Sequence, residues 1–155
     1  MLEKLDQTDI RILQILQENA RLTNKEIGEK LYKSASTIND RIRRMQEKGY
    51  IKKYVAVLDP SMIGRGLTAF THVKLKVHSK EHILHFEQEV IKFQEVLECY
   101  HMSGDYDFII RIAVRDLDAY HTFLMNHLFD SIDIASIQST FVMREAKMVM
   151  PSPIG

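Results

Sequence analysis

The sequence predicts an α+β protein, in which an N-terminal trihelical helix-turn-helix domain is joined by a β-strand linker to a C-terminal ferredoxin-like βαββαβ domain. Apolar residues recur at helical spacing over the first fifty residues and alternate with period two in later segments. Those later segments follow one another in the order βαββαβ. We expect residues 1–50 to form the helical domain, 51–66 the linker and 67–155 the ferredoxin-like domain.

Each predicted helix of the first domain starts at a capping residue. Asp6, with Asp9 three residues later, begins the first helix. Thr23 and Glu26 form a capping box for a short second helix, and Ser34 caps the third after a tight turn. This order is that of a helix-turn-helix motif, although trihelical bundles that do not bind DNA have a similar pattern.

The stretch 34–49 has the pattern of a DNA-reading helix. Ala35, Ile38, Ile42 and Met45 fall on one apolar stripe. The opposite side carries short hydrogen-bonding side chains and then arginines. The residues that we expect at DNA are Ser34, Ser36, Thr37, Asn39, Asp40, Arg43, Arg44 and Lys48, with Lys52 or Lys53 as auxiliary contacts. An ordinary amphipathic surface helix would also be polar on its outer side.

The members of this set have different expected roles. The short polar side chains are predicted to face base edges or nearby phosphates, and the cations to bind the DNA backbone. Asp40 would repel phosphates unless it accepts from cytosine or pairs with Arg43 or Arg44, and we favour the pairing. Arg41 lies about 60° from the apolar stripe, so it either anchors the helix within the domain or touches DNA.

The net charge of zero conceals two halves of opposite sign. Residues 1–66 hold 13 Lys and Arg against 9 Asp and Glu, for a net charge of +4. Residues 67–155 hold 8 against 12, for a net charge of −4. The first half therefore suits contact with a polyanion, and the second is expected to avoid nucleic acid.

The composition argues against several other classes of protein. The sequence has no run of 18 apolar residues and no signal-peptide pattern, so we expect a cytoplasmic protein without a membrane partner. Its one cysteine, Cys99, cannot form an internal disulfide. His78, His82 and His85 lie at helical spacing but have no cysteine or carboxylate to complete a metal site. We predict no metal, no cofactor and no enzymatic activity.

The second half alternates strands with helices after an expected strand over 50–58. In order, we expect a strand over 69–77, a helix from Ser79, strands over 95–102 and 106–114, a helix from Asp116 and a strand over 134–144. Ser103, Gly104 and Asp105 have the composition of a hairpin turn between the two middle strands.

Four segments and the third helix carry a resemblance to a known family. The segments are LDQTDIRIL at 5–13, GYIKKYVAVLDPSMIG at 49–64, VLECYHMSGDYDFII at 96–110 and STFVMREAK at 139–147. Through them, and through Ser34, Thr37 and Arg41, the chain resembles the Lrp/AsnC transcription regulators, nearest the leucine-responsive branch. It departs from the family at Tyr32 and Lys33, where glycine and an apolar residue are frequent.

The resemblance implies a winged or simple helix-turn-helix domain that binds double-stranded DNA. It also implies that the ferredoxin-like domain pairs into homodimers and then into a higher oligomer such as an octamer. A small effector, usually an amino acid, would bind at the interface between these domains. We therefore predict a sequence-specific transcription regulator modulated by an amino acid. The alternative is an oligomeric amino-acid-sensing module that acts through protein partners.

The family's effector positions fall on the predicted hairpin turn and on the last strand. They are Met102, Ser103, Gly104, Asp105, Tyr106, Asp107, Gln138, Ser139 and Thr140. Gly104 would let backbone N–H groups face an α-carboxylate, Asp105 or Asp107 would hold an α-ammonium, and Met102 and Tyr106 would line a side-chain pocket. The alternative is a hairpin in which Asp and Gly only fix the turn, with Asp107 the strongest structural candidate.

Overall fold

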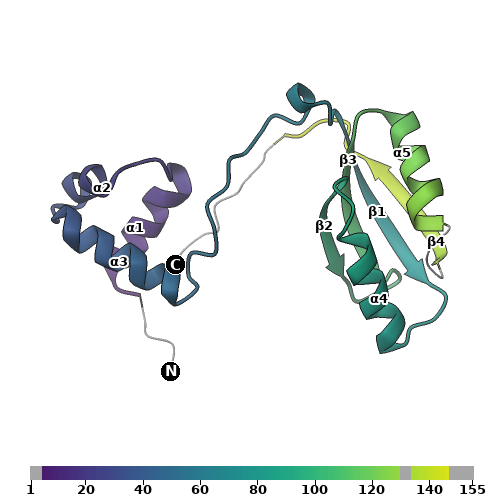
Figure 1. Ribbon diagram of the computed structural model, residues 1–155, viewed down its shortest axis with the longest axis horizontal. Coiled ribbons are helices and arrows are strands. Elements are labelled where there is room, and N and C mark those ends of the chain that lie inside the picture. The colour runs from purple at the N-terminus through teal and green to yellow at the C-terminus, as the bar shows by residue number, and fades with distance from the viewer. Residues whose placement is uncertain (1–4, 130–133, 147–155) are drawn as a thin grey trace. The chain divides into compact units, whose positions relative to one another are not determined.

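The computed structural model describes residues 5–129 and 134–146, and the chain separates into two units (Figure 1). The chain passes from the first unit to the second between Ala56 and Val57, and it returns to the first between Glu145 and Ala146. Each unit has a buried hydrophobic core of its own. The predicted α+β fold class is confirmed, because three helices form the first unit and a four-stranded sheet with helices forms the second.

The first unit consists of α1 (Gln7–Glu18), α2 (Asn24–Leu31) and α3 (Ala35–Glu47). The predicted capping box forms at Thr23 with Glu26, and the predicted N-cap residue Asp6 forms a second capping box with Asp9. The side chain of Ser34 accepts a hydrogen bond from the N–H of Thr37 and caps α3. The fully buried side chains of this core are Ile12, Ile27, Ile38 and Met45.

Two expectations for the first unit and the linker were wrong. Ala35 is exposed, because it lies in the first turn of α3, before the helix reaches the core. The strand expected over 50–58 is absent from the structure, since residues 51–59 adopt neither helix nor strand. The segment has strand-forming residues such as Val55 and Val57, but a strand needs a hydrogen-bonded neighbour, and the described sheet contains no strand before Leu67.

The second unit has the ferredoxin-like order of elements. They are η1 (Ser61–Ile63), β1 (Leu67–Leu75), α4 (Lys80–Val90), β2 (Val96–His101), β3 (Phe108–Val114), α5 (Leu117–Phe123), the π-helical segment η2 (Leu124–Phe129) and β4 (Ile134–Phe141). The strands pair antiparallel in the order β2-β3-β1-β4. Ser79 and Asp116 cap their helices as predicted.

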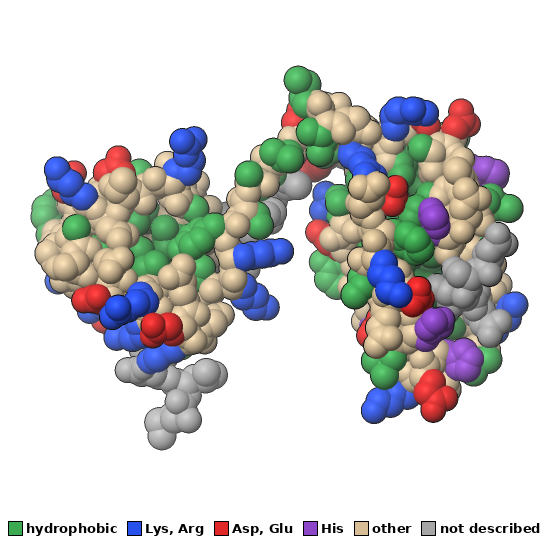
Figure 2. All heavy atoms as spheres, in the orientation of Figure 1, with side chains coloured by type: hydrophobic (Ala, Val, Ile, Leu, Met, Phe, Trp, Pro, Cys, Tyr) green, Lys and Arg blue, Asp and Glu red, His purple; other side chains and the backbone are tan. Residues whose placement is uncertain are grey.

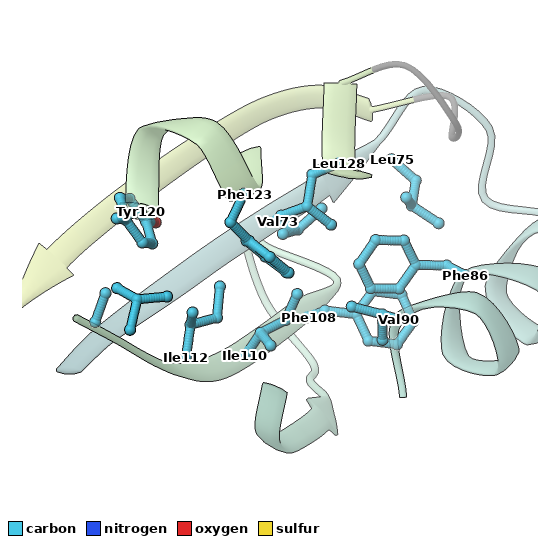
Figure 3. Close-up of a cluster of buried hydrophobic side chains, with 12 residues drawn as sticks. Val73, Leu75, Phe86, Val90, Phe108, Ile110, Ile112, Tyr120, Phe123 and Leu128 are labelled. Carbon is cyan, nitrogen blue, oxygen red and sulfur yellow. The ribbon is translucent and has the colours of Figure 1, made fainter. Parts of the chain in front are cut away.

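The core of this unit lies between the helices and one face of the sheet. Side chains of β1 and β3 point toward Phe86 and Val90 of α4 and toward Tyr120 and Phe123 of α5 (Figure 3). The rings of Phe86 and Phe108 have centroids 4.4 Å apart. Alternate side chains of the strands therefore form a second sheet face that the helices leave uncovered.

The last elements differ in detail from the sequence prediction. The strand expected over 134–144 ends at Phe141. Val77, the last residue of the strand expected over 69–77, lies beyond β1 and is exposed. In the helix that begins after Asp116, Tyr120 and Phe123 point into the core, while the apolar residue Leu117 is exposed.

Candidate DNA-binding surface and effector site

The first turn of α3 presents three hydroxyl groups to solvent. Ser34 Oγ lies 3.0 Å from Ser36 Oγ and 2.8 Å from Thr37 Oγ1. Ser34 also accepts from the backbone N–H of Thr37 at 3.2 Å, so it serves as the helix cap. A hydroxyl can both donate and accept, so this cluster suits phosphate oxygens as well as base edges.

The middle of α3 carries alternating acidic and basic side chains on its exposed side. Asp40 Oδ1 lies 3.6 Å from Arg43 Nη2, and Glu47 Oε1 lies 3.9 Å from Arg43 Nε. Figure 2 shows the two signs of charge intermixed along the edge of the unit where α3 lies. The predicted pairing of Asp40 with an arginine is confirmed. Because the Arg43 side chain is 68% exposed, its guanidinium remains accessible to a phosphate.

The inner arginines of α3 hold the helix to α1. Arg41 Nη1 donates to Asp6 Oδ2 at 2.6 Å and to Asp9 Oδ1 at 2.8 Å. Arg44 Nη2 donates to Asp9 Oδ2 at 2.7 Å, and Asp9 is only 2% exposed. The hydrogen bonds of Arg41 to Asp6 and Asp9 raise the pKa of Arg41, and the one to Asp6 lowers the pKa of Asp6.

The sequence left open whether Arg41 anchors α3 within the domain or touches DNA. Its contacts with Asp6 and Asp9 show that it anchors the helix. Arg44 has the same anchoring contact with Asp9, which the sequence analysis missed. The Arg44 side chain is still 42% exposed, so its phosphate contact stays a prediction. Asp6 and Asp9 are about 35 residues from their partners, and no local pattern indicates which arginine they bind.

The remaining predicted contacts surround this part of α3. Asn39 is exposed and accepts a hydrogen bond from Asn24 Nδ2 at 3.0 Å. Lys48 follows the helix as its C-cap residue. Lys52 and Lys53 are exposed in the segment without helix or strand. The polar set therefore comes from one helix and its flanks, while Ile38 and Met45 on the other side are buried.

The hairpin turn of the candidate effector site is closed by backbone bonds. Met102 N–H donates to Asp107 O at 2.8 Å, and Asp107 N–H donates to Val73 O at 2.9 Å. Gly104 has a φ of 128°, which L side chains rarely adopt. The four turn residues Met102, Ser103, Gly104 and Asp105 are exposed.

Asp107 fixes the turn to the end of β1. Its Oδ2 accepts from the N–H of Leu75 at 2.8 Å, and its Oδ1 lies 2.9 Å from Nδ1 of His78. Both carboxylate oxygens are therefore engaged within the unit. This geometry favours the structural role for Asp107 and leaves Asp105 as the acidic side chain free to face an effector.

The turn and β4 meet on the uncovered sheet face, but not through all the predicted residues. The hydroxyl of Tyr106 donates to Oε1 of Gln138. Ser139, by contrast, points to the helix-covered face, where its Oγ lies 2.6 Å from the hydroxyl of Tyr120. Side chains alternate along a strand, so Gln138 and Thr140 share a face from which Ser139 is excluded. The expectation that all three face one site was wrong.

His72 is a residue of this region that the sequence analysis missed. It lies opposite Gln138 in the sheet, and its ring centroid is 5.3 Å from that of Tyr106. Its Nδ1 is buried and has no hydrogen-bond partner among the described residues. The alternation of β1 places His72 on the uncovered face, but a strand pattern does not indicate which polar side chain lacks a partner.

Two of the three histidines at helical spacing have partners of their own. His78 bonds Asp107, and His82 Nδ1 lies 2.7 Å from Oγ of Ser79. Within the ranges 5–129 and 134–146, no group of three or more His, Cys, Asp or Glu side chains is arranged to hold a metal ion. In the same ranges, no helix combines the length and apolarity needed to cross a membrane.

Two family models match adjacent parts of the chain. The Lrp/AsnC ligand binding domain matches residues 68–151, and a winged helix-turn-helix DNA-binding domain matches residues 5–52.

The chain belongs to the Lrp/AsnC family.

Relatives of this Lrp/AsnC protein are transcription regulators. A Bkd operon transcriptional regulator of Pseudomonas aeruginosa is 30% identical over 97% of this chain and 99% of its own length. A glutamate uptake regulatory protein of Zymomonas mobilis is 35% identical over 99% of this chain and 94% of its own. These similarities show that the chain is a DNA-binding transcription regulator of the Lrp/AsnC type with a ligand-binding domain.

Solved structures of the same family agree in fold. A transcriptional regulator of Neisseria meningitidis, solved as a complex with L-Met, is 35% identical and superposes with a TM-score of 0.92 over 97% of both chains. AsnC of Escherichia coli is 26% identical, with a TM-score of 0.88 over 97% of this chain and 100% of its own. In the described residues, no strand lies between α3 and β1.

Proposed function

We propose that this Lrp/AsnC regulator is a cytoplasmic, non-enzymatic protein that binds pseudo-palindromic DNA sites and responds to an amino acid. Residues 1–50 would read DNA, 51–66 would link the domains, and 67–155 would bind the effector and assemble the oligomer. The DNA-binding part of the proposal rests on the difference between the two sides of α3. Its inner side is buried and ion-paired to α1, while Ser36, Asn39 and Arg43 are exposed together.

The DNA role is tested by replacing one exposed arginine of α3. Arg43→Ala should lower affinity for a promoter fragment and reduce the slope of log affinity against log salt by about 0.9 for each half-site, the loss of one phosphate contact per copy. Arg21→Ala is the control, because Arg21 is an exposed arginine outside α3. Equal effects of the two variants would remove the DNA role from this helix, and a wild-type protein without promoter binding would favour the protein-partner alternative.

The uncovered sheet face is proposed as the surface on which two copies pair. Phe70 and Tyr100 are 37% and 52% exposed there, and burying such side chains against a second copy is favourable. Phe70→Glu should shift the sedimentation of the protein toward monomer at micromolar concentration. Leu84→Glu, on an exposed position of α4, should leave it unchanged. A wild-type protein that sediments as a monomer would contradict the proposed pairing of two copies.

The amino-acid effector is proposed to bind at the turn over 102–106 together with Gln138. The support is the exposed Gly104 turn, the Tyr106–Gln138 contact and the L-Met complex of a 35% identical regulator. Calorimetric titration with each of the twenty amino acids should give heat with one or a few of them. Gly104→Val should abolish that heat, while Gly64→Val, at another positive-φ glycine, should keep it. Absence of heat with all twenty would remove the effector.

A further inference from the structure

One side-chain contact joins the outer surfaces of α2 and α3. Asn24, the first residue of α2, donates through Nδ2 to Oδ1 of Asn39, at 3.0 Å and across 15 residues of sequence. Asn39 lies within α3 on its exposed side. The bond therefore ends on a side chain of the surface that the proposed function assigns to DNA.

An exposed amide can face either way, and in the structure this bond directs the oxygen of Asn39 toward Asn24. An asparagine amide has one oxygen that accepts and one nitrogen that donates twice. With the oxygen of Asn39 directed at Asn24, its NH₂ group is the part that faces outward. Two-point recognition of adenine by asparagine needs both the oxygen and the nitrogen, so this orientation disfavours adenine.

A stabilising role alone does not account for the contact. The hydrogen bond is exposed and neutral, and such bonds contribute little to stability. The two helices are already joined through Ile27 and Ile38, which are fully buried. The N-terminus of α2 is capped by Thr23 and Glu26, so the amide of Asn24 is not needed there.

We infer that Asn24 is a positioning residue for base readout, which turns the NH₂ group of Asn39 toward acceptor atoms of DNA. The acceptors that fit in the major groove are N7 and O6 of guanine or O4 of thymine. This inference rests on the proposed function, because it concerns which base α3 prefers at one position of the site.

The orientation can be reversed by one substitution. In Asn24→Asp the new carboxylate only accepts, so the amide of Asn39 must rotate to donate to it. The oxygen of Asn39 then faces outward and accepts from N4 of cytosine or N6 of adenine. A side chain that does not itself read the base would thereby change which base is preferred.

The experiment is selection of binding sites from a pool of randomised DNA duplexes with the full-length protein. The wild-type protein should enrich guanine or thymine at one position of each half-site. Asn24→Asp should enrich cytosine or adenine at that position and leave the other positions unchanged. Asn24→Ala should weaken discrimination there by roughly fivefold, the lower end for one good side-chain pair. Asn39→Ala should show the same loss.

Lys25→Gln is the matched control, since it also changes the charge by −1 at the next residue of α2. It should weaken binding to all sequences and keep every base preference. Identical preferences in the wild-type protein and Asn24→Asp would overturn the inference while leaving the DNA role intact. A wild-type protein that enriches no sequence would overturn both. Thermal unfolding of each variant, monitored by circular dichroism, should match that of the wild-type protein.

Discussion

Tyr32 occupies a backbone conformation that favours glycine. Its φ is 54° and its ψ is 44°, and its side chain is 95% exposed. Tyr32→Gly should raise the free energy of unfolding by about 1 kcal/mol, because glycine removes the steric cost of the left-handed region. Chemical denaturation monitored by circular dichroism measures the change. Tyr32→Ala should have little effect, since alanine retains Cβ, and a destabilised glycine variant would show that the tyrosine ring has a stabilising contact.

Asp6 makes the stability of the first unit sensitive to acid. Its pKa is lowered, chiefly by the hydrogen bond from Arg41, so it lies below the value in the unfolded chain. Its contribution is complete above the unfolded pKa, near 4, and is lost as the pH falls through the folded pKa. Urea unfolding should show Asp6→Asn less stable than wild type at pH 7, with the two proteins converging toward pH 3. A constant difference across that range would contradict the prediction.

At the residue scale, the sequence indicated which side of α3 is exposed but not the partners of its arginines. The Asp40–Arg43 pair spans three residues, so helical spacing was enough to predict it. Arg41 and Arg44 bind carboxylates of α1 more than thirty residues away, and only the packing of the two helices brings them together. The face of Ser139 was missed because the register of β4, which fixes it, depends on pairing with β1.

Among the elements, the close packing of α2 against the turn before α3 requires a glycine at position 28. A Cβ at Gly28 would lie 2.5 Å from the carbonyl oxygen of Lys33, a backbone atom of the turn. Gly28→Ala should therefore destabilise the protein by about 2 kcal/mol, as overpacking does, and weaken DNA binding. Thermal unfolding and a gel shift measure the two effects. Gly66→Ala should be tolerated, since its Cβ would lie 3.8 Å from the carbonyl oxygen of Arg115.

Three hydroxyl groups connect α5 to β1 and β4 inside the second unit. The hydroxyl of Tyr120 lies 2.6 Å from Thr71 Oγ1 and 2.6 Å from Ser139 Oγ. Tyr120→Phe should lower the free energy of unfolding by about 2 kcal/mol, because it removes this partner from the buried hydroxyl of Thr71 and from the half-buried hydroxyl of Ser139. Adding Thr71→Val and Ser139→Ala should restore part of the loss in urea unfolding. A further loss would show that the hydroxyls act independently of Tyr120.

Elements were predictable from the sequence where their signals are local. Ser34, Ser79 and Asp116 each accept from a nearby backbone N–H, and each begins a helix as predicted. The segment over 50–58 has strand composition but no neighbouring strand in the described chain, so its composition misled the prediction. The π-helical turn after α5 has no sequence signal that we recognise.

For the whole molecule, proteolytic cleavage at one site would separate the two halves of opposite net charge. Lys52 and Lys53 are exposed in a segment without helix or strand, where proteases cleave readily. Cleavage after Lys53 would give an N-terminal piece with 12 Lys and Arg against 8 Asp and Glu, and a C-terminal piece with 9 against 13. Brief trypsin treatment should yield pieces that bind cation and anion exchangers, respectively, at pH 7. Cleavage first within α1 to α3 would contradict this.

The inner arginines of α3 pair with carboxylates, and Arg43 lies on its outer side. This difference affects how the DNA site of such a regulator can change during evolution. Arg41 and Arg44 both donate to buried Asp9, so replacing Asp9 takes a carboxylate from both arginines, and replacing either arginine takes one of its two cations from the buried carboxylate. Ser36, Asn39 and Arg43 carry no such constraint from the core. Duplicated copies of the gene can therefore acquire new operators by substitution on the outer side of α3 while the inner charges keep the helix in place.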